Sequence, residues 1–421
     1  MAFLLIKIIE DNLGRIYDLF GFRRYELSFE TMNKSLNSDI QLMTERQEHI
    51  TQGLTILLKD LENNNNVSSH GRYMIINEIK GYLISKSKVY KAIDIEPSLA
   101  ETKIFRPVFI LSLPRTGSTF LHCLLSQDSR WKAPAYWEIL QQIPVITDPL
   151  MEEHKNIIKT FNRNTNFLKD IWGREDIENS HLMDITDPED VATLLAAEGL
   201  HFLLNDIFEL PNYKRYLSNL PYDTWVKIYK NMKLRLQVLS RYQNMENRRL
   251  MLMFHLGSYN NKLALLDVFP DAQFIFLHRD LSKIIPSVAS LFSYIARQYY
   301  PRNKEDVQLI CNNLTKRYIR ETETIDDWLN HEKFQNTSFK RVHHISFKEL
   351  VDFPLDTVKA IYNAVDMTYT NECEALFKTY IDEQKQHKRN KHKYRNMNID
   401  KEEIEDKTRE YCNKYSIQKG L

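Results

Sequence analysis

The sequence predicts an α/β protein in which a parallel β-sheet is flanked by helices. Four short runs are almost continuously apolar, at residues 107–113, 249–254, 272–277 and 341–347, and helical stretches separate them. Strands that are buried on both faces of a parallel sheet have this composition. The 421 residues include only 10 glycines and 13 prolines, which disfavours an all-β protein built from many tight turns.

Helical patterns dominate the rest of the chain. Residues 1–100 are expected to form a helical N-terminal extension, because apolar residues recur there at helical spacing. The asparagine-rich stretch at 62–71 interrupts that pattern and predicts a surface loop. Residues 101–421 are expected to form the α/β domain, with a helical insertion at about 140–245 between its first two predicted strands.

The overall charge and the cysteines restrict the classes of protein that fit. The 57 Lys and Arg residues against 56 Asp and Glu leave a net charge of +1, so any anion site must be local, and no basic-aromatic module indicates nucleic acid. The four cysteines lie far apart without a CxxC pair, which favours a reducing compartment. No run is apolar and long enough to span a bilayer, and no signal-peptide cleavage site follows the N-terminus. We therefore expect a cytoplasmic protein, and its oligomeric state stays open.

The stretch FRPVFILSLPRTGSTFLHCLL, residues 105–125, predicts an anion-binding loop between a strand and a helix. Gly117 allows close approach of the backbone, and Ser118 or Thr119 begins the helix, whose N-terminus attracts an anion. Arg115 adds a planar, permanently charged guanidinium. The alternative is an ordinary turn that Gly117 eases and Ser118 caps. The GxxxxGK[ST] pattern of nucleotide hydrolases is missing from this loop.

Two later segments carry further candidate anion ligands. Arg279 follows the predicted strand 272–277 at the edge where open α/β sheets bind ligands, and Ser287 lies about two helical turns beyond it. Arg279 could instead pair with a carboxylate, and Ser287 could be a solvated helix residue. The basic stretch 384–395 holds six Lys or Arg and two His, and it could close over a dianion, remain a solvated tail or contact nucleic acid.

Taken in order, these segments resemble the sulfotransferases that use 3′-phosphoadenosine 5′-phosphosulfate (PAPS). They are most similar to the bacterial and tyrosylprotein-type branch, whose loop reads PRTGTT or PRSGTT. The resemblance covers about residues 70–400 and also rests on APAYWE (133–138), DPEDVATLL (187–195) and ISFKELVDFPLDTVKAIYNAV (345–365). It implies a P-loop-NTPase-like sheet and sulfuryl transfer from PAPS to a hydroxyl or amine of an acceptor, which could be a small molecule, a lipid or a carbohydrate.

The resemblance also implies roles for individual residues. Arg279 and Ser287 would bind the 3′-phosphate of PAPS, while Lys391, Lys393 or Tyr394 in the basic stretch would close over the nucleotide. Because fixed cations and hydrogen bonds can stabilise sulfuryl transfer, and no metal-ligand spacing is convincing, no metal is expected. Five consecutive residues would surround the 5′-phosphosulfate: Arg115, Thr116, Gly117, Ser118 and Thr119.

Two residues are candidates for the base that takes the acceptor proton. Glu138 stands at nearly the distance from the loop arginine at which tyrosylprotein-type enzymes place a glutamate, although it could simply cap or solvate the next helix. His255 matches the histidine of an LKSPxHL-like segment in related sequences, whose lysine position is here Met251.

The missing lysine leaves alternatives open. Arg115 alone could supply the positive charge, or Arg248 or Arg249 could reach the site. Otherwise the chain could be a nucleotide-binding or scaffold homologue with weakened catalysis. A P-loop kinase or NTPase is disfavoured, because Ser118 lacks the preceding lysine that such enzymes place at the β- and γ-phosphates.

Overall fold

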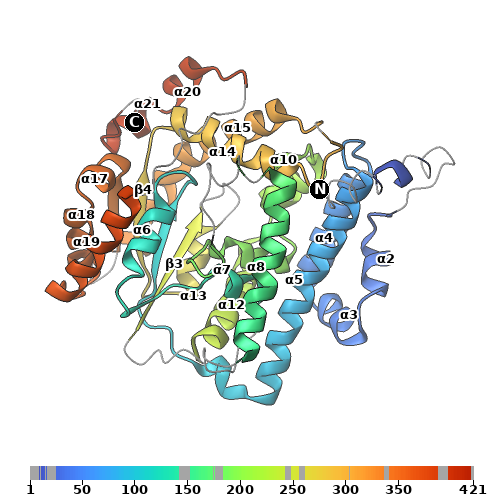
Figure 1. Cartoon of the computed structure of the whole chain (residues 1–421), viewed down its shortest axis with the longest axis horizontal. Helices are drawn as coiled ribbons and strands as arrows, with labels where there is room; N and C mark the ends of the chain where they lie inside the picture. Colours follow the sequence, from blue (N-terminus) through green and yellow to red (C-terminus); the bar gives the residue numbers. More distant parts are fainter. Residues whose placement is uncertain are drawn as a thin grey trace.

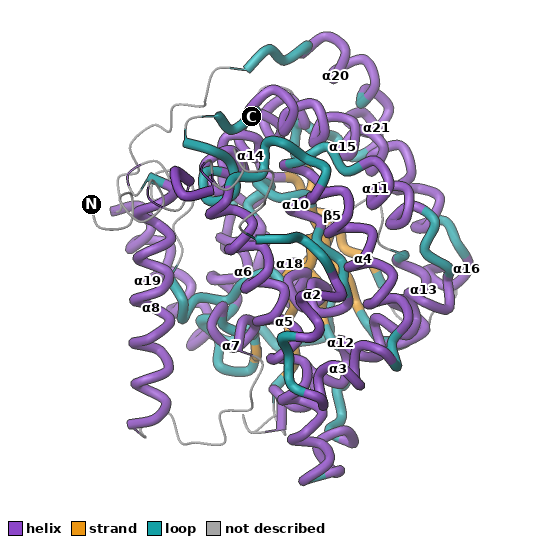
Figure 2. The backbone as a smooth tube through the Cα atoms, turned by 90° about the vertical axis from the view of Figure 1, so that its right-hand side faces the viewer, coloured by secondary structure: helices purple, strands orange, loops and turns teal. Residues whose placement is uncertain are grey.

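Five parallel strands form one sheet within the part of the chain that the structure describes. The strand order is β2-β3-β1-β4-β5, and helices surround the strands in Figure 2. The predicted α/β class, with a parallel sheet flanked by helices, is confirmed. The strands are β1 (Val108–Ser112), β2 (Trp131–Lys132), β3 (Arg249–His255), β4 (Gln273–His278) and β5 (Val342–Ser346). The computed structural model describes residues 9, 11–14, 16, 25–141, 152–173, 175, 184–241, 248–255, 261–302, 304–335, 341–386 and 397–418.

The four predicted strands agree with β1, β3, β4 and β5 to within one or two residues. Strand β1 lies at the centre of the sheet, and its side chains alternate between two apolar cores. Phe109 and Leu111 pack on one face, whereas Val108 and Ile110 pack on the other. Both faces of the strand are therefore buried, which accounts for the continuous apolar run in the sequence.

The N-terminal helices share a core with the sheet. Leu54 and Leu57 belong to the same buried cluster as Phe109 of β1. Figure 1 shows α4 and α5 on one side of the strands and α17, α18 and α19 on the opposite side. The elements before β1 are α2 (Phe29–Lys34), α3 (Ser38–Glu45), α4 (Glu48–Glu62), α5 (Ser69–Ile95) and η1 (Pro97–Glu101).

Most of the remaining chain that the structure describes is helical. No helix in it has the length and apolar composition required to cross a bilayer. Helix α6 (Ser118–Leu125) follows β1. Between β2 and β3 lie α7 (Tyr136–Gln141), α8 (Glu152–Trp172), η2 (Val191–Glu198), α10 (Phe202–Ile207), α11 (Pro211–Ser218) and α12 (Tyr222–Arg241). After β3 come α13 (Lys262–Val268), α14 (Leu281–Ala296), α15 (Val307–Leu329), α16 (Glu332–Gln335), α17 (Phe347–Asp352), α18 (Pro354–Ala364), α19 (Asn371–Gln386), α20 (Lys401–Lys407) and α21 (Arg409–Lys414).

The strand register aligns the carboxyl ends of the three central strands. Ser112, the last residue of β1, is paired with His255 at the end of β3 and with Leu277 near the end of β4. The loop after β1, the imidazole of His255 and the residues that follow β4 therefore meet at one edge of the sheet. Ligands of open α/β sheets bind at this edge.

Candidate active site

The loop between β1 and α6 has the backbone conformation of an anion-binding turn. Arg115 (φ 69°) and Gly117 (φ 88°) both adopt the left-handed region, and Gly117 is the N-cap of α6. Thr116 donates its hydroxyl to the carbonyl of Leu113 at 2.9 Å, which holds the turn closed. Such turns direct successive backbone N–H groups, together with the positive end of the helix dipole, toward one point.

Gly117 is expected to be intolerant of even a methyl group. A Cβ atom there would approach Leu350 Cδ2 to 3.0 Å, in addition to the strain of a positive φ. Gly117→Ala should therefore lower the free energy of unfolding by about 1–2 kcal/mol in urea denaturation. Gly81→Ala is the matched control, because that exposed helical position has open space around it and should gain about 0.5–1 kcal/mol. Equal stability of the two variants would contradict the argument.

The structure brings Arg115, Arg279 and Ser287 together. The Nε of Arg115 donates to Ser287 Oγ at 3.0 Å, and the Nη1 of Arg279 donates to the backbone carbonyl of Arg115 at 2.6 Å. The guanidinium of Arg279 also stacks on Phe347, 3.8 Å from the ring centroid. Two fixed cations and a hydroxyl therefore lie beside the loop at the carboxyl edge of the sheet.

A chain of hydrogen bonds connects the loop to His255. Ser118 Oγ lies 3.2 Å from Nε2 of His255, and the other ring nitrogen, Nδ1, lies 2.7 Å from Asp190 Oδ2. Burial alone would lower the pKa of His255, but the charge and hydrogen bond of Asp190, aided by Glu189, raise it above its usual value. Asp190 orients the imidazole so that Nε2 faces the loop, as in the carboxylate–histidine pairs that activate bases.

Asp190 is itself held rigidly, and its role was not predicted from the sequence. Its Oδ1 accepts from the N–H of Ala192 at 2.8 Å, so it caps η2, and its backbone pairs with Met253 beside β3. The segment DPEDVATLL signals only a helix start. Asp190 and His255 are 65 residues apart along the chain, so their contact could not be predicted from sequence spacing.

A cavity of about 640 Å³ opens beside this chain of hydrogen bonds. Arg115, Thr119, Asp190 and His255 all line it. Its size suits a small organic ligand, and apolar and aromatic side chains form much of its wall. The aromatic members are Tyr82, Tyr136, Phe161, Phe202, Phe292 and Tyr299.

Glu138 lies apart from these groups. Its buried carboxylate accepts from Lys132 Nζ at 2.8 Å and from the N–H of Ala135 at 2.8 Å, where it stabilises the start of α7. Its helix neighbours Tyr136 and Leu140 line the cavity, whereas Glu138 is not among the described lining residues. The other predicted nucleotide ligands, Lys391, Lys393 and Tyr394, lie outside the described residues.

The position of the missing lysine lies in the apolar core. Met251 is fully buried, packs with Leu121 and pairs with Val108 at the opposite end of the strand pair from His255. A charged side chain there would be desolvated among apolar groups, so its absence removes no charge from the carboxyl edge. Arg249 donates to the carbonyls of Arg106 and Val365 at the other edge of the sheet.

Among the residues that the structure describes, no group of three or more His, Cys, Asp and Glu side chains is placed to hold a metal ion.

Comparisons with known proteins show the family and the fold. The family model described as "Sulfotransferase family" matches residues 107–371. The fold is similar to that of the sulfotransferase STF9 from Mycobacterium avium, with a TM-score of 0.74 and 19% identity over 93% of this chain and 97% of that one. It is also similar to STF1 from Mycobacterium tuberculosis, with a TM-score of 0.70 and 20% identity over 91% of this chain and 99% of that one. These likenesses confirm the P-loop-NTPase-like part of the predicted fold. No curated protein sequence matches the chain.

Proposed function

The chain belongs to the sulfotransferase family, and from this premise we propose that it moves a sulfuryl group from PAPS to an acceptor hydroxyl, or an amine, in the 640 Å³ cavity. One observation carries the proposal. His255 is fixed by Asp190, contacts Ser118 of the anion-binding loop and lines the same cavity as Arg115. A base, a cation and an anion-binding turn therefore meet at one place.

The residues present fit the two anionic ends of PAPS, which would supply the sulfuryl group and leave as 3′,5′-adenosine bisphosphate. The backbone N–H groups of the loop and the N-terminus of α6 suit the 5′-phosphosulfate, with Arg115 beside them. Arg279 and Ser287 suit the 3′-phosphate, because they lie next to that loop on the segment after β4. Ser118 and Thr119 add hydroxyls at the start of α6, while Thr116 contributes its backbone to the turn.

His255 is the proposed base. Its Nε2 would take the acceptor proton while the acceptor oxygen forms its bond to sulfur and the bond between sulfur and the bridging phosphate oxygen breaks. Asp190 would stabilise the imidazolium that results, since its carboxylate lies 2.7 Å from Nδ1. Arg115 would stabilise the negative charge that develops on the leaving phosphate.

The cavity wall supports an acceptor with an apolar body. Leu203, Leu204 and Phe292 lie on it, so a phenol, a sterol-like alcohol or a lipid hydroxyl would bury apolar surface there. The hydroxyls of a bare sugar would lose water without gaining hydrogen-bond partners on the apolar parts of this wall. The free, buried cysteines support the proposed reducing, cytoplasmic location.

The test is a transfer assay with PAPS labelled in its sulfuryl group. The purified chain is incubated without metal and with a panel comprising a simple phenol, a sterol, a long-chain alcohol and a monosaccharide. We expect labelled product with at least one apolar acceptor and release of 3′,5′-adenosine bisphosphate in equal amount. Failure to bind 3′,5′-adenosine bisphosphate, together with Mg²⁺-dependent hydrolysis of ATP, would overturn the proposal.

A further inference from the structure

A second cavity, of about 1640 Å³, lies between the N-terminal helices and the insertion. Residues of α3, α4 and α5 line one side, and residues of α11 and α12 line the other. Among the residues that the structure describes, none lines both this cavity and the acceptor cavity. Whatever it binds is therefore not explained by the proposed sulfuryl transfer.

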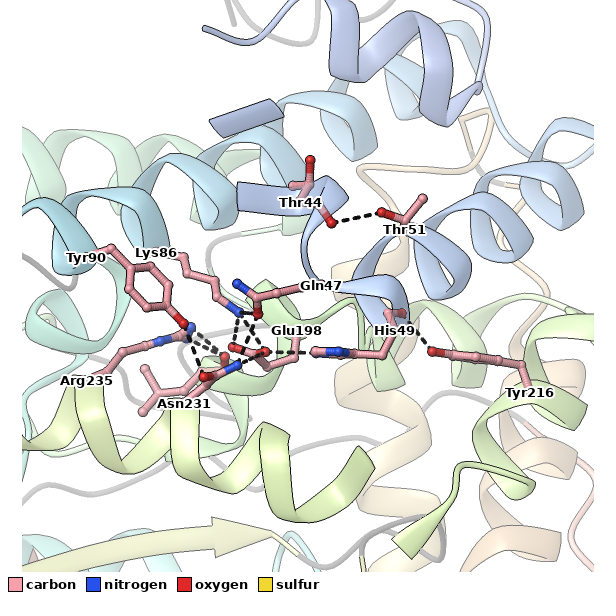
Figure 3. Close-up of polar contacts among 11 residues, drawn as sticks. Thr44, Gln47, His49, Thr51, Lys86, Tyr90, Glu198, Tyr216, Asn231 and Arg235 are labelled. Atoms are coloured by element: carbon pink, nitrogen blue, oxygen red, sulfur yellow. Dashed lines mark hydrogen bonds and ion pairs between the residues drawn. The ribbon is translucent and has the colours of Figure 1, made fainter. Parts of the chain in front are cut away.

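A buried ion pair fixes the side chains on the floor of this cavity. Lys86 Nζ lies 2.6 Å from Glu198 Oε1, and each side chain is only 1% exposed. Glu198 also lies 3.1 Å from His49 Nε2 and accepts from Asn231 at 2.9 Å, while Gln47 accepts from Lys86 at 2.7 Å. Figure 3 shows these side chains converging on Glu198. Gln47, His49 and Asn231 line the cavity, so its floor is a preorganised polar surface.

The uncharged polar groups of the wall match a ligand rich in hydroxyls. Side-chain amides and hydroxyls can each donate and accept, and a ligand hydroxyl is the small group that satisfies both functions. Tyr90 and Tyr216 add aromatic rings to the same wall. The amides and hydroxyls are Gln47, Gln52, Ser87, Asn219, Thr224 and Asn231.

The charged groups of the wall favour an anion. Within the described part of the chain, four lining cations make no ion pair, and three lining carboxylates, Glu48, Asp60 and Asp94, make none either. Four positive charges against three leave an excess of one. The cations are Arg46, Lys59, Arg215 and Lys227.

Two of the lining carboxylates, Asp39 and Asp60, already have partners within the protein. Asp39 pairs with Lys91 at 2.7 Å. Asp60 accepts from the backbone N–H groups of Asn212 and Tyr213 at 2.9 Å, so it holds the start of α11. These neutral donors leave the charge of Asp60 in place, so one excess positive charge of the wall is available to a ligand.

We propose that this cavity binds an acidic saccharide, that is, a sugar with several hydroxyls and at least one carboxylate or sulfate. The amides and hydroxyls of the wall, with the tyrosine rings, would hold the hydroxylated ring, and the unpaired cations would hold the acidic group. Each ligand class that lacks one of these two features leaves part of the wall unsatisfied. A neutral sugar leaves the cations without a partner, and a bare oxyanion makes no use of wall amides and hydroxyls such as Gln52 and Thr224.

Four probes separate the two features. Ligand-observed NMR titrations would compare glucuronic acid, glucose 6-sulfate, glucose and inorganic sulfate. We expect the two acidic sugars to bind with dissociation constants of about 1 mM or tighter, and about tenfold more tightly than glucose or sulfate. Sulfate that binds as tightly as glucose 6-sulfate would overturn the proposal in favour of a plain anion site, and no saturable binding by either acidic sugar would overturn it outright.

Substitutions on the rim locate the binding. Floor residues are unsuitable, because Glu198 ends η2, the element that Asp190 caps beside His255. Arg46→Gln and Lys227→Gln each remove an exposed charge. Each should lower the affinity for glucuronic acid by about fivefold without changing the melting temperature of the protein. Lys401→Gln, an exposed site on α20 that does not line the cavity, should change nothing. Undiminished binding in the double variant Arg46→Gln, Lys227→Gln would place the sugar elsewhere and refute the proposal, whereas intact sulfuryl transfer in that variant would leave the proposed function standing.

Discussion

Replacing His255 with glutamine is expected to slow sulfuryl transfer by about a thousandfold, because glutamine cannot accept the acceptor proton at neutral pH. The affinity for 3′,5′-adenosine bisphosphate should remain within about twofold of wild type, since the glutamine amide can still hydrogen-bond to Ser118 and both Arg115 and Arg279 are unchanged. Single-turnover rates with labelled PAPS and calorimetric titration of the product nucleotide measure the two quantities separately.

The pH profile distinguishes a base from a structural histidine. The imidazole accepts a proton only when it is neutral, and Asp190 and Glu189 raise the pKa of His255 despite its burial. The value of kcat/KM should therefore be full above this raised pKa and fall as the pH drops through it. Asp190→Asn removes the charge that raises the pKa, so the acidic limb of the profile should move to lower pH and the rate should fall by about a hundredfold.

Glu138→Gln is the comparison that decides between the two predicted bases. The substitution keeps the shape of the side chain and an oxygen that can accept from Lys132 and Ala135. We expect its transfer rate to stay within about threefold of wild type once thermal unfolding shows that the variant is folded. Full activity of His255→Gln combined with loss of activity in Glu138→Gln would reverse the assignment.

Most of the strands could be predicted because residues that are buried on both faces of a sheet are apolar. Each central strand packs on two faces, so β1, β3 and β4 appear as unbroken apolar runs. Strand β2 has no such apolar run. It has two residues, Trp131 and Lys132, and forms only because Arg249 and Leu250 of β3 offer an edge to pair with.

Some residues of the candidate site could also be predicted from the sequence, and others could not. Arg115, Gly117 and Arg279 are predictable, because each directly follows a recognisable strand and the ends of parallel strands meet at one edge. Asp190 is not predictable in this way, because it enters the site from the insertion and reaches His255 only through tertiary packing.

The missing lysine shows how a comparison by sequence position can mislead. Counting four residues back from His255 leads to Met251, and a loss of charge from the site seems to follow. In a strand, however, four residues span about 13 Å, so that position lies at the other end of β3. Met251 packs in the core there, and the cations of the carboxyl edge include Arg115 and Arg279 instead.

Replacing Arg279 with alanine is expected to weaken the binding of 3′,5′-adenosine bisphosphate by about a hundredfold, or about 2.7 kcal/mol. A guanidinium that binds a phosphate makes charge-assisted hydrogen bonds in a fixed, planar geometry, and the ring of Phe347 holds Arg279 in place for that purpose. Arg279→Lys keeps the charge but loses the planar fork and much of the stacking, so it should recover only about tenfold of the lost affinity. Calorimetric titration measures the affinity of wild type, Arg279→Ala and Arg279→Lys for this nucleotide.

Arg279 has a second contact that could produce the same loss by another route, because its Nη1 donates to the carbonyl of Arg115 and so supports the loop. Adenosine 5′-monophosphate, which lacks the 3′-phosphate, separates the two causes. If Arg279 binds the 3′-phosphate, wild type should bind the monophosphate about a hundredfold more weakly than the bisphosphate, and Arg279→Ala should weaken it little further. If Arg279→Ala lowers the affinity for both nucleotides equally, the role of Arg279 is to hold the loop. Other residues must then bind the 3′-phosphate.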